Sequence, residues 1–553
     1  MDFTGQKSTP YTVDILHQHG VENVIICPGS RNAPLTLAFA RHGKFNCISI
    51  IDERSAGYFA LGLAQSTKKP VAIVCTSGTA PLNFAPAIAE AFHQQIPLIV
   101  LTADRPESWI NQQDGQAIEQ KSLYANIIAK SFSLKGELYN EDDLWLTQRT
   151  VNEAFHIAQS KSRPVHINIS FAEPLYEDSY ATVKANKVNV FKLPSFFSYW
   201  ETILKDKKNT LVVVGQAEFN PTIVSAVNKM SKVSNAVVIS ENLANIPVGY
   251  HIINATEALI FQNEKMIPDV VVYMGGPIVS KQLKKHIASL AVPVVRVQLN
   301  EEEVDTFQNN TAIVQQSVVD AMETLSDYLI ENTKTSDFAE EWRTASAKAF
   351  EKRNQYVAQI NYSDFTVYDF IARHIPAKSN VHLGNSTPVR YSQIFNDLYK
   401  TDCCFYANRG TSGIDGSTST AVGFSYASES INILITGDLS FQYDANAFFN
   451  NHLNGNLKVI IINNSGGNIF RLIDGPRGQK ERSEFFETSL KHEFSNLAKH
   501  FNLNYFPAKD EKGLSTAWND FIKKSERPSV LEIFTNAELS ANTFKEFYKK
   551  IQQ

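Results

Sequence analysis

The sequence has few cysteines and no long hydrophobic runs, and both absences narrow the class of protein. Its 553 residues include 5 cysteines, an odd number without CxxC spacing, which argues against a disulfide framework or a zinc motif. No apolar run reaches the roughly 18 residues of a membrane span, and the first residues lack the pattern of a signal peptide. We therefore expect a soluble, cytoplasmic protein without an integral membrane segment, whose reduced cysteines are core residues: Cys27, Cys47, Cys75, Cys403 and Cys404.

The chain also lacks an excess of positive charge. Its formal net charge is -5, which argues against general nucleic-acid binding because that function normally needs a basic face. Any anionic ligand must then be met by locally placed arginines and lysines. The remaining composition, 43% hydrophobic and 20% charged, is that of an ordinary globular protein. At this length we expect about three or four domains.

Alternating strand-like and helical stretches predict an α/β fold of three doubly wound domains with mainly parallel sheets. Expected helices include 34–41, 55–65 and 86–94, and a helical, charge-rich stretch covers 320–359. We place the domains at 1–176, 195–345 and 360–553. The expected strands are 24–27, 47–51, 71–76, 98–102 and 165–169, then 211–214, 236–239, 270–273 and 294–297, then 381–383, 404–407, 431–436, 459–462 and 530–533.

The stretch Ile431 to Phe470 organises the third domain. Two apolar, β-branched runs end in Gly437-Asp438 and in Asn463-Asn464, which is typical of buried parallel strands. Between them we expect a crossover helix from Asp444 to Leu453, the connection that parallel strands require. The carboxyl ends of the two strands should then lie side by side, where open α/β sheets commonly bind ligands.

The residues at these two strand ends suit a magnesium ion. Asp438, Asn464 and a backbone carbonyl of the flexible Ser465-Gly466-Gly467 are hard oxygen donors, so we predict a metal-bridged diphosphate. The spacing resembles the thiamine-diphosphate motif, although Leu439, followed by Ser440, replaces its usual third residue, glycine. The plain alternative is ordinary loop chemistry, because Gly-Asp pairs and Asn-rich turns are common after strands.

That resemblance suggests a role for two further residues. Thiamine-diphosphate enzymes need a carboxyl group that hydrogen-bonds the aminopyrimidine, and Glu53, just past an apolar strand, is the candidate. They also need a bulky apolar side chain that holds the cofactor bent, and Ile414 on a glycine-rich loop is available. The alternatives are a glutamate that only interacts with a helix dipole and a core isoleucine that caps its loop.

Several arginines stand at strand ends. Arg31, Arg105, Arg390 and Arg409 each follow an expected strand, and Ser386 precedes Arg390 by one helical turn. A guanidinium matches a carboxylate in bidentate fashion, so the set suggests a pocket for polycarboxylates. Taken singly, each arginine is an ordinary surface ion-pair partner.

Ordered segments from Pro28 to Phe470 are similar to those of the 2-succinyl-5-enolpyruvyl-6-hydroxy-3-cyclohexene-1-carboxylate synthases of menaquinone biosynthesis. They read PGSRNAPLT, DERSAGYFALGLA, TSGTA, LTADRP, GQAIEQ, FAEPLY, NSTPVR, NRGTSGIDGSTSTA, GDLSFQYDANA and NNSGGNIF. The resemblance implies pyrimidine-binding, central and diphosphate-binding domains. It also implies a transferase that uses thiamine diphosphate and Mg²⁺, with Mn²⁺ as an alternative, to decarboxylate 2-oxoglutarate and add its succinyl unit to isochorismate.

The resemblance also implies residue roles. The cofactor would be held by Gly437, Asp438, Leu439, Ser440, Asn464, Gly466, Ile469, Glu53 and Ile414, with Asp438, Asn464 and the Gly466 carbonyl on the metal. Glu53 and Arg409 would act in catalysis, and Ser386 with Arg390 would hold the distal carboxylate of the succinyl unit. The other substrate contacts would be Ser30, Arg31, Arg105, Gln116, Lys281, Arg409 and Phe470. Gln282 follows Lys281 at a position where some relatives have a second cation. Whether the middle domain contributes to isochorismate binding is therefore left open.

In this superfamily the glutamate and the diphosphate site come from different subunits, so the resemblance implies a homodimer or a dimer of dimers. Two alternatives stay open. One keeps the cofactor but uses another acceptor or oxidant, as acetohydroxyacid synthases and pyruvate oxidases do. The absence of an evident flavin motif, and a Gly275-Gly276-Pro277 turn without the full GxGxxG pattern, count against it. The other is a non-catalytic cofactor-binding subunit.

Overall fold

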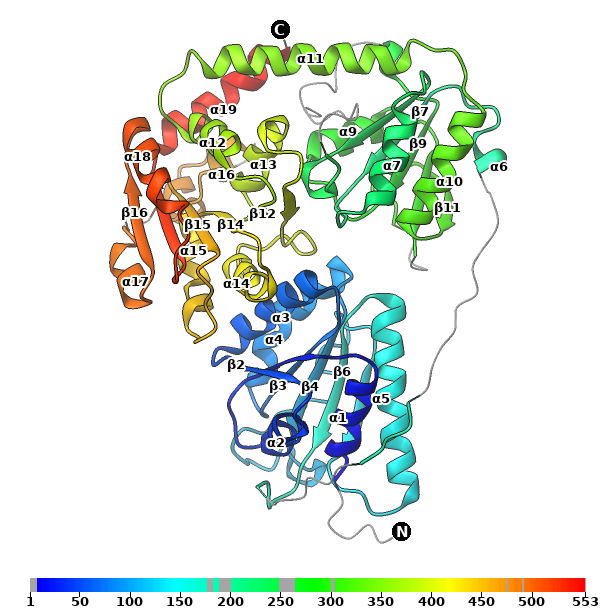
Figure 1. Cartoon of the computed structure of the whole chain (residues 1–553), viewed down its shortest axis with the longest axis vertical. Helices are drawn as coiled ribbons and strands as arrows, with labels where there is room; N and C mark the ends of the chain where they lie inside the picture. The colour runs from blue at the N-terminus through cyan, green and yellow to red at the C-terminus, as the bar shows by residue number, and fades with distance from the viewer. Residues whose placement is uncertain are drawn as a thin grey trace.

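The computed structural model describes residues 7–176, 183–187, 200–247, 264–299, 304–473, 476–489 and 492–552. Figure 1 shows three lobes: an N-terminal lobe in blue and cyan, a middle lobe in green, and a C-terminal lobe in yellow to red. Each lobe holds one parallel sheet with helices against it, as the alternating pattern predicts. The α/β fold class is therefore confirmed, while the three domain boundaries stay a prediction.

The N-terminal lobe contains a six-stranded sheet in the order β2-β1-β3-β4-β6-β5. Its central strands are fully buried, which explains why they read as continuous apolar runs. The strands are β1 Asn23–Ile26, β2 Asn46–Ser49, β3 Val71–Cys75, β4 Leu98–Asp104, β5 Ser131–Lys135 and β6 Val165–Ser170. The helices are α1 Thr9–Gln18, α2 Ala33–His42, α3 Glu53–Thr67, α4 Ala80–Gln94 and α5 Glu141–Lys161.

The middle lobe contains a five-stranded sheet in the order β11-β10-β9-β7-β8. Its strands are β7 Thr210–Val214, β8 Ala236–Ser240, β9 Val270–Met274, β10 Val294–Gln298 and β11 Asn310–Gln315. Its helices are α6 Trp200–Leu204, α7 Pro221–Met230, α9 Lys281–Ser289, α10 Val318–Glu331 and α11 Phe338–Val357. Helix α11 runs from the middle lobe to the C-terminal lobe (Figure 1).

The C-terminal lobe contains a six-stranded sheet in the order β13-β12-β14-β15-β17-β16. Its strands are β12 Asn380–Leu383, β13 Cys404–Tyr406, β14 Asn432–Gly437, β15 Leu457–Asn463, β16 Asn504–Ala508 and β17 Ser529–Phe534. Its helices are α12 Asp364–His374, α13 Thr387–Ile394, α14 Ser417–Ala427, α15 Asp438–Tyr443, α16 Ile469–Leu472, α17 Ser495–His500, α18 Glu511–Phe521 and α19 Ala537–Gln552.

The expected strands are confirmed to within a few residues, but the helix expected at Asp444–Leu453 is wrong. Helix α15 begins at Asp438 and ends at Tyr443, and only a 3₁₀ turn, Ala445–Phe448, follows. The buried carboxylate of Asp444 accepts hydrogen bonds from the backbone N–H and the hydroxyl of Ser419, both 2.7 Å, so it is committed to α14. Asparagines beyond it favour local turns over a helix.

Strands β5, β11 and β16 were not predicted from the sequence. Each lies at an edge of its sheet and is only partly buried. Each of these three strands keeps polar residues on its exposed side, so it lacks the apolar run by which buried strands are recognised.

The N-terminal and C-terminal lobes are joined through α3 and α14, which cross at very short distance (Figure 1). A Cβ placed on Gly62 would lie 2.0 Å from the carbonyl oxygen of Thr420, and one on Gly423 would lie 2.1 Å from that of Phe59. The two glycines therefore let the helix backbones touch, and this contact fixes the two lobes to each other.

The cysteines are free thiols, of which Cys27, Cys75 and Cys403 are buried and the other two are half-buried. Among the described helices, none is long and apolar enough to cross a membrane.

Candidate active site

The two strand ends that were predicted to bind a metal meet in the structure. Strands β14 and β15 pair in parallel, with Gly437 opposite Ile462. Asp438, the first residue of α15, accepts hydrogen bonds from the backbone N–H of Leu439 and of Gly466, both 2.8 Å. Asp438 and Gly466 are thus in contact at the carboxyl edge of the sheet, as the βαβ arrangement requires.

Asn464 is oriented by a residue that the sequence did not single out. Its side-chain amide nitrogen donates to Oδ2 of Asp364, 3.0 Å away, and Asp364 is fully buried at the start of α12. The carbonyl oxygen of an amide points away from its nitrogen, so this bond turns the oxygen of Asn464 to the other side. No local motif marks Asp364, because its role depends on a neighbour far along the chain.

The charge state of Asp438 suits a cation. The pKa of its carboxyl is raised to about 7, chiefly by burial and also by the charge of Asp364, against the opposing effect of the N–H groups of Leu439 and Gly466. A carboxylate that is buried without a positive partner is costly. Together with the hard oxygen of Asn464 and the carbonyl of Gly466, it forms a donor set that fits a divalent ion such as Mg²⁺ or Mn²⁺.

The residues predicted to surround the cofactor lie next to these donors. The hydroxyl of Ser440 donates to the carbonyl oxygen of Ile414, 2.7 Å away. The side chain of Ile414 is 41% exposed, so the alternative of a core isoleucine is wrong. Ile469 and Phe470 begin α16, and the Phe470 ring faces that of Phe486, with 5.8 Å between centroids.

Ser386, Arg390 and Arg409 gather at the same edge. Ser386 has a φ of 77°, a strained conformation of the kind found at functional sites, and its carbonyl accepts a hydrogen bond from Arg390. Arg409 donates from Nη1 to Oδ1 of Asn385, 2.8 Å away. Arg390 and Arg409 thus bind adjacent residues, Ser386 and Asn385. Burial lowers the pKa of Arg409, and the charge of Arg390 lowers it further. A pair of arginines at one edge can receive an anion.

The N-terminal residues form a second group at the carboxyl edge of their own sheet. The backbone N–H of Arg31 donates to Thr76 Oγ1 at 3.3 Å, and Arg105 Nε donates to the carbonyl of Gly115 at 2.8 Å. Gln116, next in the chain, packs against Gly78 after β3. Ser30 is exposed beside Arg31. The predicted contacts to one substrate thus lie together.

Both arginines of this group have carboxylate partners. Arg31 pairs with Glu173 at 3.2 Å and Arg105 with Asp114 at 2.6 Å. An anion that binds here must compete with these carboxylates.

Glu53 is the first residue of α3. The side chain of Asp52 caps the helix by accepting from the N–H groups of Arg54 and Ser55, at 2.9 and 3.2 Å. Glu53 is half-buried, and burial raises the pKa of its carboxyl. Its place in the first turn agrees with the helix-dipole alternative, while its raised pKa suits a proton-exchanging group.

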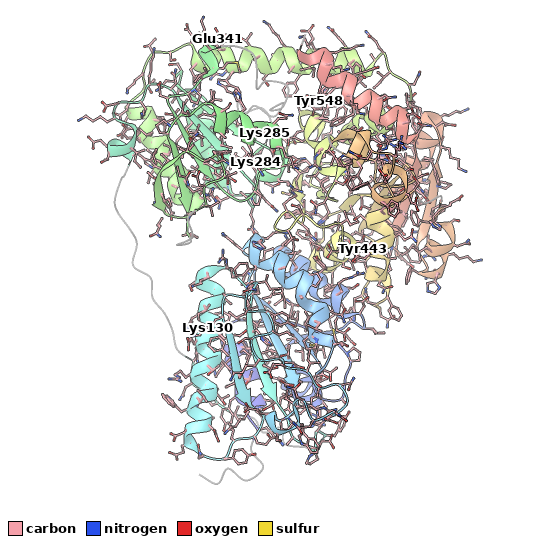
Figure 2. All side chains as sticks on the ribbon, turned by 180° about the vertical axis from the view of Figure 1, so that it is seen from behind. Lys130, Lys284, Lys285, Glu341, Tyr443 and Tyr548 are labelled. Carbon is pink, nitrogen blue, oxygen red and sulfur yellow. The ribbon has the colours of Figure 1, made fainter. Side chains whose placement is uncertain are left out.

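Glu53 and the proposed metal-binding residues are not linked by a polar contact within the described part of the chain. Over the described part of the chain, no hydrogen bond or ion pair links Glu53 to Asp438, Asn464 or Gly466. Lys281 is the first residue of α9 in the middle lobe. Figure 2 shows Lys284 and Lys285 of α9 on the side of the middle lobe that faces the C-terminal lobe. Burial lowers the pKa of Lys284, as do the nearby charges of Arg409 and Lys281.

A buried hydrogen-bond network behind Arg105 was also missed. Gln120 donates from Nε2 to Oδ1 of Asn168 at 2.9 Å and accepts from the N–H of Gly78 at 3.0 Å. Asn168 donates in turn to Oδ2 of Asp104 at 2.7 Å. Gln120 ends the segment GQAIEQ and could have been suspected, but Asn168 lies inside an ordinary apolar strand.

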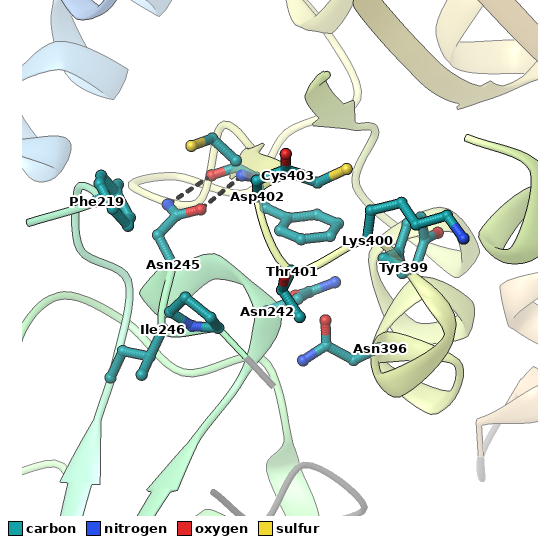
Figure 3. A pocket seen from close by; sticks show the side chains of 13 residues that line it. Phe219, Asn242, Asn245, Ile246, Asn396, Tyr399, Lys400, Thr401, Asp402 and Cys403 are labelled. Atoms are coloured by element: carbon teal, nitrogen blue, oxygen red, sulfur yellow. Dashed lines mark hydrogen bonds between the residues drawn. The ribbon is translucent and has the colours of Figure 1, made fainter. Parts of the chain in front are cut away.

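A separate cavity of about 190 Å³ lies between the middle and C-terminal lobes (Figure 3). Its lining includes Asn242, Asn245, Tyr399 and Lys400, and none of the predicted site residues. There the side chain of Asn245 donates a hydrogen bond to the carbonyl of Phe405 and accepts one from the backbone N–H of the same residue. The cavity is therefore distinct from the candidate active site.

Comparison with known proteins identifies the family to which the chain belongs. Two protein-family models match the chain. The family described as thiamine pyrophosphate enzyme, N-terminal TPP binding domain, matches residues 7–123, and the one described as thiamine pyrophosphate enzyme, C-terminal TPP binding domain, matches residues 391–533. The chain is 36% identical to the 2-succinyl-5-enolpyruvyl-6-hydroxy-3-cyclohexene-1-carboxylate synthase of Flavobacterium psychrophilum, over 98% of each chain. The chain belongs to this synthase family.

Other members of the synthase family match along the same length. Those of Porphyromonas gingivalis and Bacteroides fragilis are each 34% identical over 100% of this chain, covering 98% and 100% of their own. The family resemblance read from the sequence is therefore confirmed. The two TPP-binding matches fall on the N-terminal and C-terminal lobes, which carry Glu53 and Asp438 respectively.

Proposed function

We propose that this protein is a thiamine-diphosphate-dependent transferase that decarboxylates 2-oxoglutarate and adds the succinyl unit to isochorismate in a 1,4-addition. The product is 2-succinyl-5-enolpyruvyl-6-hydroxy-3-cyclohexene-1-carboxylate, an intermediate of menaquinone biosynthesis. The observation that carries the proposal is the meeting of Asp438, Asn464 and Gly466 at two adjacent strand ends. That edge lies in a chain that resembles the named synthases over its full length.

When bound, thiamine diphosphate would supply a nucleophilic carbon that can accept a 2-oxo acid and stabilise the charge left after CO₂ departs. Asp438, Asn464 and the carbonyl of Gly466 would hold the metal on its diphosphate, and Gly437, Leu439, Ser440 and Ile469 would line the site. Ile414, exposed beside Ser440, would support the bent cofactor. Glu53 would hydrogen-bond the aminopyrimidine and hold the proton there, a role that its raised pKa favours.

Different charged residues would bind the two anionic substrates. Ser386 and Arg390 would hold the distal carboxylate of 2-oxoglutarate, with Arg409 near the reacting atoms and Phe470 on the wall. Ser30, Arg31, Arg105, Gln116 and Lys281 would face isochorismate. Its carboxylates would replace Glu173 on Arg31 and Asp114 on Arg105, which exchanges one ion pair for another and costs little electrostatic energy.

We propose a homodimer, in which each site takes Glu53 from one subunit and the metal-binding edge from the other. Apolar side chains near both groups are exposed in the single chain: Ile51 is 53% exposed, Tyr443 54% and Phe449 48%. Tyr443 lies at the side of the C-terminal lobe next to the N-terminal lobe (Figure 2), where its carbonyl accepts from Arg54 at 2.8 Å. A second copy of the chain would bury this surface. Pairing of two dimers, and the cytoplasmic location, stay predictions.

The test is to mix purified protein with thiamine diphosphate, Mg²⁺, 2-oxoglutarate and isochorismate, and to follow isochorismate loss with each component omitted in turn. We expect loss only in the complete mixture. Pyruvate replaces 2-oxoglutarate in a parallel reaction, and turnover with pyruvate alone would support the acetohydroxyacid-synthase alternative. Cofactor binding without any turnover would support the non-catalytic subunit.

A further inference from the structure

The loop between β13 and α14, residues 407–416, receives contacts from all three lobes. It carries Arg409 and Ile414, two residues of the proposed site. At its start, Gln216 of the middle lobe donates to the carbonyl of Ala407, 3.0 Å away. Near its end, the hydroxyl of Tyr58 in α3 donates to Asp415, 2.8 Å away. Because the loop has no regular secondary structure of its own, such contacts decide where its side chains lie.

The strongest of these contacts comes from Glu90 in α4 of the N-terminal lobe. Its side chain is buried, with 1% of its surface exposed. The carboxylate accepts from the backbone N–H of Gly410 and of Thr411, both 2.8 Å, and from the hydroxyl of Thr411 at 2.6 Å. Gln94, one turn later in α4, supplies a further donor at 2.6 Å. Hydrogen bonds to a buried charged acceptor are stronger than neutral ones, so Glu90 holds this part of the loop firmly.

The loop lies directly on the helix at this point. A Cβ placed on Gly410 would lie 2.8 Å from the carbonyl oxygen of Glu90 and 3.1 Å from the backbone nitrogen of Gln94. A larger residue would push the loop off α4, so glycine is required by the close approach.

The opposite side of the loop is held within the C-terminal lobe. Asn385 donates from Nδ2 to the carbonyls of Asn408 and Gly413, both 2.7 Å, and its Oδ1 accepts from Arg409 at 2.8 Å. Arg409 therefore sits between an anchor in its own lobe and Glu90 in the other. The negative charge of Glu90 also raises the pKa of Arg409, against the lowering by burial.

We propose that Glu90 is a positioning residue, through which the N-terminal lobe sets the place of Arg409 and Ile414 in the C-terminal lobe of the same chain. The inference rests on the proposed function, since it assigns those two residues to the site. It gives the N-terminal lobe a second role, because Glu53 would serve the cofactor bound by the partner subunit, while Glu90 would shape the site of its own subunit.

The test is Glu90→Gln, which keeps the shape of the side chain but replaces one oxygen by an amino group. Whichever way the amide lies, one of the two loop N–H groups then faces another donor. We expect kcat to fall roughly 10- to 100-fold, as for a reacting group displaced by a fraction of an ångström to one ångström. The KM for 2-oxoglutarate and the affinity for thiamine diphosphate, followed by circular dichroism, should change little, because Arg390 and Asp438 are untouched.

The matched control is Asp510→Ala, which removes another carboxylate that accepts a backbone N–H, that of Gly513 at 2.7 Å, at the start of the outer helix α18. It should lower the melting temperature without lowering kcat. Thr411→Val is a second variant that removes only one of the three hydrogen bonds from the loop, so kcat should fall by about three- to tenfold.

The outcomes separate the two proposals. If wild-type protein does not consume isochorismate, the proposed function fails. If wild-type protein is active but Glu90→Gln and Thr411→Val both keep the kcat of the control, the positioning role of Glu90 is overturned. Should Glu90→Gln not fold, the Thr411→Val measurement decides alone, and an unchanged kcat then overturns the proposal.

Discussion

At the residue scale, Glu53 is a carboxyl group whose burial raises its pKa at the first position of α3. In the proposed function it holds a proton that the reaction must move, which a carboxamide cannot do. We expect Glu53→Gln to retain thiamine-diphosphate binding, measured by circular dichroism, and to lower kcat by at least about 100-fold.

The control for this variant is Glu22→Gln, which changes an exposed glutamate paired with Lys69 on the surface. It should leave both quantities unchanged. A Glu53→Gln protein with a rate close to that of the wild type would contradict the assigned role.

A second residue-level prediction concerns Arg390 and the binding of 2-oxoglutarate. Its guanidinium donates to the carbonyl of Ser386, next to the Asn385 that Arg409 contacts, so it is placed to hold one end of a dicarboxylate. We expect Arg390→Ala to lower kcat/KM for 2-oxoglutarate roughly 10- to 100-fold, the loss of a hydrogen bond to a charged group.

Steady-state kinetics with each substrate varied in turn checks this expectation. Arg373→Ala provides the comparison, because Arg373 is an exposed arginine of α12 that pairs with Asp369 one turn away. Equal kcat/KM values in the two variants would remove Arg390 from the donor site.

At the scale of elements, the crossing of α3 and α14 sets how the two lobes that form the site are joined. Gly62 faces a backbone carbonyl of Thr420, and no side-chain rotation can relieve a Cβ at 2.0 Å. We therefore expect Gly62→Ala to destabilise the protein by about 3 kcal/mol or more, read as a lower melting temperature.

Gly513→Ala in α18 is the comparison, since its nearest atom would be a side-chain oxygen of Asp510 at 3.2 Å. It should be far less harmful, because alanine favours a helix more than glycine does. Similar melting temperatures for the two variants would mean that the α3–α14 contact opens easily.

At the scale of the whole molecule, the proposed dimer makes a complementation test possible. Glu53→Gln and Asp438→Ala are each expected to be inactive alone. If the two residues of one site come from different subunits, a mixed dimer has one intact site and one doubly altered site. After the two variants are unfolded and refolded together in equal amounts, we expect activity to return to about a quarter of the wild-type level.

Refolding each variant by itself is the control, and sedimentation gives the oligomeric state. No recovery from mixed samples that are dimeric would show that Glu53 and Asp438 serve the same subunit, and the proposed arrangement of the dimer would then be wrong.

Much of the architecture follows from local pattern. Buried parallel strands such as β14 and β15 read as apolar runs because both of their faces are covered, and the residues just after them stand at the ligand-binding edge of the sheet. Asp438, Asn464 and Gly466 could therefore be chosen before the structure was known. Strands β5, β11 and β16 could not be read because they are partly exposed, and the helix expected from Asp444 onward was wrong because Asp444 accepts a long-range hydrogen bond from Ser419.

Local sequence was sufficient to identify the fold class, because strand periodicity and turn composition depend on near neighbours in the chain. The family and the residues proposed for the chemistry came from the resemblance of ordered segments to the synthases. Three-dimensional packing was needed to establish that Asp364 orients Asn464 and that Glu90 holds Gly410 and Thr411. These relations join residues far apart in the sequence, and only the packing of helices and sheets brings such residues together or keeps them apart.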